Sequence, residues 1–291
     1  MIDQVYGTDL RVSVTVPANK PELLMVDWSF GIDCGNDSLL LVYSRHASQW
    51  KQVLRWQSKA DESISDAFGD FFQYAVVPLG PTERWGVAVA HGHPWCTSRW
   101  SGFDLDVIAP AQDSLPQRVL FHKSAGYVRF EDVRPIIKPK QDGFDLRLEV
   151  GLMDPDIMTR CGVYRFRTTE ENIERIQPIA MNGRDFVDEW LNVKWADAGR
   201  WSSPEHLAQL KSEHDRFERR LQPESKNYPS FSYGAVRGCS DDRQHFQIET
   251  SEDPGNLMYF QIMQGANSFT MQSISRQPNP LCKGPDLMRR Q

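Results

Sequence analysis

The 291-residue sequence lacks the short motifs that most directly indicate a chemistry. It has no Gly-x-Gly-x-x-Gly or Walker-type phosphate loop, which disfavours nucleotide-dependent reactions. It has no Gly-x-Ser-x-Gly elbow to expose a serine nucleophile. Its five cysteines are widely spaced and include no Cys-x-x-Cys pair, which argues against a zinc ribbon or a thioredoxin-like redox motif. No catalytic residue is therefore assigned, and no cofactor is expected apart from a divalent metal discussed below.

Long apolar runs and an excess of positive charge are also absent. The longest apolar stretches, such as Ser38–Tyr43 and Tyr74–Leu79, are far shorter than the ~20 residues of a membrane-spanning helix. The first residues contain neither a basic nor an apolar segment of a secretory leader. With a net charge of −6 and mixed charges, the chain has no basic face for nucleic acid. We expect a soluble protein that binds neither membranes nor nucleic acid.

The cysteines leave the compartment open. They suit buried free thiols in the cytoplasm, which is the location we favour. They also suit up to two disulfide bonds and one unpaired thiol in an oxidising compartment.

Most of the chain has the pattern of short β-strands. Between Arg11 and Ala180, alternating or β-branched segments such as Arg11–Val16, Val87–His91 and Phe144–Val150 are separated by Gly, Pro, Asp or Asn. This pattern predicts an all-β fold, with a propeller-like or sandwich assembly of short antiparallel strands.

One tetrapeptide recurs within this region. Gly102–Leu105 and Gly143–Leu146 both read Gly-Phe-Asp-Leu, 41 residues apart. This separation is close to the ~40 to 50 residues of a propeller blade. The alternative is a chance recurrence of a strand pattern that any β protein can use.

A different pattern begins near residue 182. Asn182 is placed to cap a first helix that ends near Val193, and Ser203 with Pro204 predicts the start of a second helix within Ser202–Gln222. The two apolar stripes are Phe186, Val187, Trp190 and Leu191, and then Leu207, Leu210, His214, Phe217 and Leu221. We expect His214 to be a packed histidine with one hydrogen-bonded ring nitrogen.

Strand patterns return after this two-helix excursion near residues 183–222. We predict a single domain over residues 1–291. Residues 1–181 would be mainly β, residues 182–222 helical, and residues 223–291 strands that complete the domain.

The stretch Ala90–Cys96, "AHGHPWC", is the most suggestive for metal binding. On a strand, His91 and His93 would point to one face, and Cys96 could return as a third ligand to zinc, iron or manganese. The nearest further ligands are His122, Asp104 and Asp106. The alternative is a strand end in which the histidines cap a sheet edge and neighbouring tryptophans pack into the core.

Tryptophans suggest a second kind of site. Trp85, Trp95 and Trp100 flank the histidine stretch and could form an aromatic rim that binds sugar faces or proline-rich peptides.

Two functional hypotheses remain. The first is a non-enzymatic β-rich module that binds a protein or glycan partner. The second is a hydrolase acting on glycans or esters, with Asp or Glu residues, or a metal at His91 and His93, as its chemistry. An enzyme would gather these histidines with carboxylates in one pocket, whereas a binding module would expose aromatic side chains. The partner and the oligomeric state do not follow from the sequence.

Overall fold

A computed structural model describes residues 10–32, 35–58, 72–94, 100–112, 115–128, 135–148, 162–180, 182–220, 231–239, 242–252, 255–266 and 268–288. The chain divides into two compact units, an N-terminal unit (Met1–Glu174) and a C-terminal unit (Arg175–Gln291). Four-stranded sheets dominate both units, so the predicted all-β class is confirmed. None of the described helices is long and apolar enough to cross a membrane.

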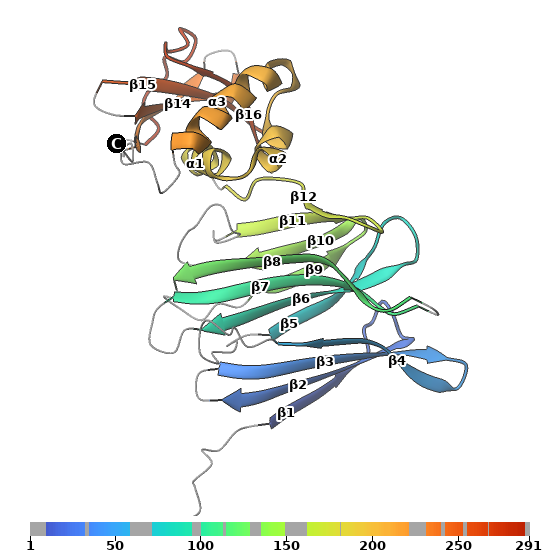
Figure 1. Ribbon diagram of the computed structural model, residues 1–291. Coiled ribbons are helices and arrows are strands. Elements are labelled where there is room, and N and C mark those ends of the chain that lie inside the picture. Colours follow the sequence, from blue (N-terminus) through green and yellow to red (C-terminus); the bar gives the residue numbers. More distant parts are fainter. Residues whose placement is uncertain are drawn as a thin grey trace, which may run out of the picture. The chain divides into compact units, whose positions relative to one another are not determined.

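The N-terminal unit contains three sheets, each built from strands that follow one another in the chain (Figure 1). Sheet A consists of β1 (Leu10–Thr15), β2 (Leu23–Ile32), β3 (Gly35–His46) and β4 (Gln49–Gln57). Sheet B consists of β5 (Phe72–Pro78), β6 (Trp85–Pro94), β7 (Trp100–Ala109) and β8 (Arg118–Val128). Sheet C consists of β9 (Ile136–Lys140), β10 (Gly143–Leu148), β11 (Gly162–Thr168) and β12 (Ile173–Arg175).

Sheets A and B pack through one apolar core. In β3, Leu40 and Val42 are fully buried, whereas the alternating residues Leu39 and Leu41 are only partly buried, as the two-residue period of a strand requires. The core residues are Leu23, Met25, Leu40, Val42, Val53, Leu54, Trp56, Val76, Val87, Val89 and Ile108. Each buried side chain of this size contributes about 1.5 to 3 kcal/mol, so this core holds the two sheets together.

Sheet C packs next to sheet B. The ring of Phe166 stacks on Phe144 at 4.9 Å and meets Phe121 of β8 edge-on at 5.7 Å. The hydroxyl of Thr168 donates a hydrogen bond to the carbonyl oxygen of Pro78 at 2.6 Å. Aromatic packing and a hydrogen bond between sheets therefore fix this contact.

The repeated tetrapeptide does not mark equivalent positions in the sheets. Gly102–Leu105 lies in β7, the third strand of sheet B, whereas Gly143–Leu146 lies in β10, the second strand of sheet C. The 41-residue separation is therefore not the period at which the sheets follow one another. The second strands β2 and β6 begin at Leu23 and Trp85, a wider spacing.

The C-terminal unit begins with helices. They are α1 (Gly183–Asn192), α2 (Trp195–Ala198) and α3 (Leu207–Arg220), with 3-10 turns at Gly199–Trp201 and Pro204–His206. As predicted, the side chain of Asn182 caps α1 by accepting hydrogen bonds from the backbone N–H groups of Arg184 and Asp185. Ser203 makes no such side-chain bond, and the α-helix that was predicted to start at Pro204 begins only at Leu207, after a 3-10 turn.

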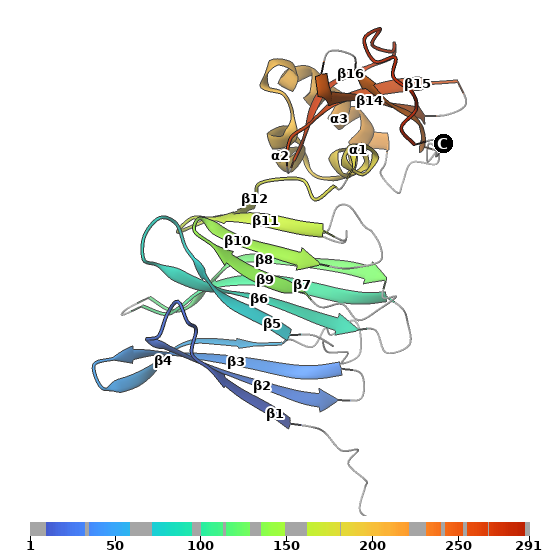
Figure 2. The same ribbon diagram turned by 180° about the vertical axis from the view of Figure 1, so that it is seen from behind.

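Sheet D completes this unit. It consists of β13 (Phe231–Cys239), β14 (Asp242–Glu252), β15 (Leu257–Gln264) and β16 (Phe269–Ser275). The helices cover one face of sheet D, as Figure 2 shows from behind, and share a core with it that includes Trp190, Phe217 and Phe260. These late strands form a sheet of their own. The single domain over residues 1–291 stays a prediction.

A disulfide bond joins Cys239, at the end of β13, to Cys282 near the chain's end. This differs from the favoured expectation of free thiols for these two residues. The sequence could not pair them, because a spacing of 43 residues does not reveal that the fold brings the two side chains together.

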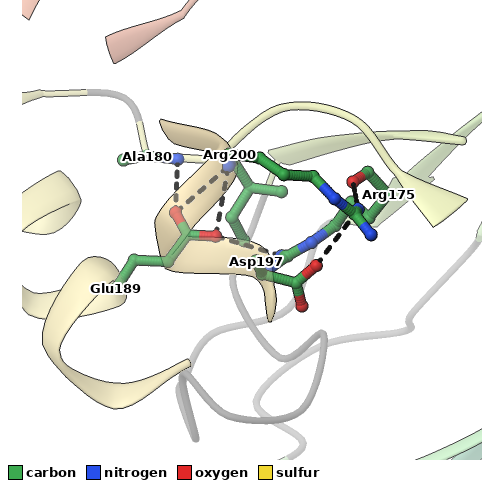
Figure 3. A network of polar contacts seen from close by, with 6 residues as sticks. Arg175, Ala180, Glu189, Asp197 and Arg200 are labelled. Carbon is green, nitrogen blue, oxygen red and sulfur yellow. Dashed lines mark hydrogen bonds and ion pairs between the residues drawn. The ribbon is translucent and has the colours of Figure 1, made fainter. Parts of the chain in front are cut away.

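A buried carboxylate ties α1 to the segment that enters it (Figure 3). Glu189 is 1% exposed and accepts hydrogen bonds from the backbone N–H groups of Ile179 and Ala180, both at 3.1 Å. Arg175 forms an ion pair with the same carboxylate at 3.0 Å. Arg200 in turn donates to the backbone carbonyl of Arg175 at 2.9 Å. The buried carboxylate of Glu189 thus has a cation and backbone donors around it, as its burial requires.

Candidate functional site

His91 lies within the core of sheets A and B. It is 3% exposed, and its ring meets Trp56 edge-on at 5.2 Å and Phe72 at 6.4 Å. Its neighbour across the strands in β7 is Asp104. His91 pairs with Phe72 of β5 on one side and Asp104 of β7 on the other, so it lies on an inner strand and packs in the core, whereas the alternative interpretation placed the histidines at a sheet edge.

The other residues of the predicted metal site and aromatic rim are only partly described. His93 lies in β6 and Trp100 begins β7, but their side chains lie outside the described part of the structure. Trp95 and Cys96 lie outside the described residues altogether. A metal at His91, His93 and Cys96 therefore stays a prediction.

Trp85 is partly buried and lines a small cavity of about 50 Å³ in the N-terminal unit. Pro110, Pro116 and Arg118 line the same cavity. The aromatic rim of Trp85, Trp95 and Trp100 stays a prediction.

A chain of hydrogen-bonded polar side chains runs over β7 and β8. Asp106 Oδ1 lies 2.8 Å from His122 Nδ1, and its Oδ2 accepts a hydrogen bond from Trp56 Nε1, also at 2.8 Å. His122 Nε2 lies 3.2 Å from Ser124 Oγ. Ser124 Oγ also donates to Asp104 Oδ1 at 2.5 Å. A carboxylate, an imidazole and a hydroxyl are therefore linked in that order.

The strand register assembles this chain. Asp104 and Asp106 alternate on β7, His122 and Ser124 alternate on β8, and the antiparallel ladder pairs Asp106 with His122 and Asp104 with Ser124. Directly opposed residues of such a ladder share a face of the sheet. The sequence suggested His122, Asp104 and Asp106 as metal ligands, and the two aspartates also as candidate hydrolase carboxylates, but it missed Ser124. The Asp-x-Asp and His-x-Ser patterns become informative only when the register is known.

Among the described residues, none covers an apolar row on the outer face of sheet A. The register places Leu10 opposite Phe30 and Val12 opposite Trp28, so these side chains share one face. The exposed fractions are Leu10 56%, Val12 54%, Val14 62%, Val16 53%, Trp28 44% and Phe30 42%. We call these six residues the outer apolar face. The sequence analysis did not identify it, since the alternating pattern of β1 is the same for a covered and an uncovered strand.

A group of metal-binding residue types lies on α3. Ligand atoms of His214, Asp215 and Glu218 lie within 4.8 Å of one another. However, Lys211 Nζ already binds both carboxylate oxygens of Asp215, at 2.8 and 2.7 Å. His214 is buried and its Nε2 bonds to the carbonyl oxygen of Val193 at 2.9 Å, which confirms the expected packed histidine. These contacts give the group a structural role.

Comparison of the chain with protein-family models and with curated proteins finds no match. Its function is therefore argued from the geometry of its own residues.

Proposed function

We propose that the chain is an interaction module that binds a protein partner through the outer apolar face of sheet A. The observation that supports this proposal is the exposure of Trp28 and Phe30 next to the aliphatic row of β1. Monomeric soluble proteins rarely expose contiguous apolar patches of more than a few hundred Å², and larger patches mark interaction sites.

The chemistry of this face favours a protein over a glycan. A sugar site combines aromatic plates with nearby hydrogen-bonding groups that fix the hydroxyls. Val12 lies opposite Trp28 and Val14 follows it on the same face, whereas the polar residues of β1, Arg11, Ser13 and Thr15, alternate onto the other face. An uncharged aliphatic surface gains most by packing against another apolar surface.

The partner that best fits is a second copy of this chain. From the exposed fractions and side-chain areas of about 150 to 250 Å², the six residues present roughly 500 Å². Two copies packed face to face would bury about 1,000 Å², the lower limit for a specific interface. A two-fold arrangement also places the same six uncharged side chains on both sides, and Asp37, opposite Phe30 at the end of this face, accepts a hydrogen bond from the hydroxyl of Ser58.

Sedimentation velocity between ~1 and ~100 µM tests this association. We expect a monomer–dimer equilibrium that Trp28→Ser and Val12→Ser shift to monomer. Trp50→Ser is the matched control, because Trp50 is 45% exposed on the same sheet. Trp50 pairs with Arg45 and Trp28 with Leu39, which places them about 20 Å apart along β3.

Two results would contradict the proposal. One is a wild-type protein that stays monomeric over the whole concentration range. The other is a Trp28→Ser variant that dimerises as strongly as the wild type while keeping the same thermal midpoint.

The disulfide bond supports an oxidising compartment as the place where this module works. Bonds such as Cys239–Cys282 persist outside the cytoplasm and are reduced within it. This proposal replaces the cytoplasmic location that the sequence favoured.

A further inference from the structure

We infer that Ser124 is the nucleophile of an ester-hydrolysing site on sheet B, with His122 as its general base and Asp106 as a positioning residue. The order of contacts carries this inference. Asp106 bonds to Nδ1 of His122, and the opposite ring nitrogen faces the hydroxyl of Ser124. The same order of carboxylate, imidazole and hydroxyl activates serine on unrelated folds, because geometry and not sequence position defines it.

The contacts also determine where the imidazole proton lies. An ionised Asp106 only accepts hydrogen bonds, so Nδ1 of His122 must donate to it at 2.8 Å. Trp56 Nε1 donates to the other oxygen at 2.8 Å and holds the carboxylate in place. With the proton on Nδ1, the lone pair of Nε2 points toward Ser124 Oγ, 3.2 Å away. That lone pair is what a general base needs.

The side chains of the proposed site differ in their exposure to solvent. The side chain of Asp106 is 15% exposed, whereas that of His122 is 56% exposed. Ser124 is exposed as well. A substrate can therefore reach the hydroxyl, while Asp106 and Trp56 stay packed beneath the ring. An open site of this kind suits small or surface-bound esters with a good leaving group.

Asp104 is the second acceptor of Ser124. In the resting structure the hydroxyl donates to Asp104 Oδ1 at 2.5 Å. Rotation of this hydroxyl about its C–O bond brings its proton to His122 Nε2, because both acceptors are within hydrogen-bond distance. Removal of the Asp104 charge should leave His122 as the main acceptor and should not abolish the reaction.

The reaction is acyl transfer to serine followed by hydrolysis. Ser124 Oγ bonds to the acyl carbon and its proton passes to His122 Nε2. The C–O bond to the leaving group breaks, and the departing oxygen takes that proton to give an alcohol. Water then attacks the acyl-serine, gives a proton to Nε2, and releases the carboxylic acid as Ser124 regains a proton.

A fluorophosphonate probe tests the nucleophile directly. Attack by Ser124 forms a P–O bond and breaks the P–F bond, so fluoride leaves and the serine proton passes through His122 to solvent. We expect one adduct per chain, located on Ser124 by peptide mass spectrometry. Ser124→Ala should give no adduct, and His122→Gln should label at least ~10-fold more slowly. Asp104→Asn should label within ~3-fold of the wild type, as the matched control that removes the charge next to Ser124 but keeps an acceptor oxygen.

A second readout is the hydrolysis of p-nitrophenyl acetate, for which His122→Gln and Ser124→Ala should lose the same activity. The inference is overturned if Ser124 carries no adduct, if His122→Gln labels as fast as the wild type, or if Asp104→Asn loses labelling as His122→Gln does. Ser124 and His122 are exposed, so the variants should keep the wild-type thermal midpoint. This site does not depend on the outer apolar face, so either proposal can fail alone.

Discussion

Replacing Glu189 with glutamine should destabilise the C-terminal unit far more than the small difference between the two side chains suggests. Glu189→Gln keeps the shape of the side chain but replaces an acceptor oxygen with an amide that donates. In one orientation the amide NH2 faces the backbone N–H groups of Ile179 and Ala180, which then have no acceptor, and in the other it faces the guanidinium of Arg175. Arg175, whose side chain is 10% exposed, is left without its carboxylate.

The size of the effect follows from this burial. Removing one partner of a buried ion pair lowers the free energy of unfolding by about 3 to 5 kcal/mol, because the remaining charge is uncompensated. Glu213→Gln is the control, since Glu213 pairs with Arg216 at 2.9 Å but is 31% exposed. A pair at that exposure contributes about 0 to 1 kcal/mol. The double variant Glu189→Gln/Arg175→Met should cost less than the sum of its single variants, with a coupling of about 2 kcal/mol.

Urea titrations read out by hydrogen–deuterium exchange of α1 peptides would measure these free energies for the C-terminal unit alone. A loss below ~1 kcal/mol for Glu189→Gln would show that the carboxylate is not the buried anchor described here. Additivity of the two single variants within ~0.5 kcal/mol would show that Arg175 and Glu189 do not act as a pair.

Two further predictions concern the disulfide and the buried carboxylate of Asp145. With a separation of 43 residues from Cys239 to Cys282, loop-closure entropy gives the bond about 4 kcal/mol, so Cys282→Ser should lower the urea midpoint of the C-terminal unit and leave that of the N-terminal unit unchanged. For Asp145, burial opposes ionisation, but Arg165 at 2.8 Å and Lys140 at 3.3 Å outweigh it and hold its pKa below the ordinary value. A lowered folded-state pKa stabilises the protein above the unfolded value of ~3.9, and this contribution is lost as the pH falls through the folded value. The stability difference between wild type and Asp145→Asn should thus be full at neutral pH and vanish in acid; a difference that stays constant down to pH 2 would contradict this.

Local patterns predicted the elements well. Asn182 caps α1 as expected, and the predicted stripe of Phe186, Val187, Trp190 and Leu191 is the buried face of that helix. These features depend on residues within a turn or two of each other, so the sequence contains all the information they need. The start of α3 was less predictable, because Ser203 and Pro204 suit a 3-10 turn as well as an α-helix.

The sequence did not reveal which sheet faces are buried and which are exposed. β1 and β10 both alternate in sequence, yet every residue of β1 is exposed while Phe144, Leu146 and Leu148 of β10 are buried. The two-residue period states which side chains share a face. Whether another sheet lies over that face depends on contacts between distant segments. The outer apolar face therefore emerges only from the fold.

The hydrogen-bonded side chains on β7 and β8 could not be predicted from the sequence either. Asp106 and His122 are 16 residues apart, and no spacing rule links them to Ser124 or to Trp56 of sheet A. A slip of one residue between β7 and β8 would turn the two pairs to opposite faces and abolish the contacts. The bulge between Val107 and Ile108 lies beside this ladder and adjusts its register. The candidate nucleophile is therefore a product of strand pairing, which is why a search for short motifs does not find it.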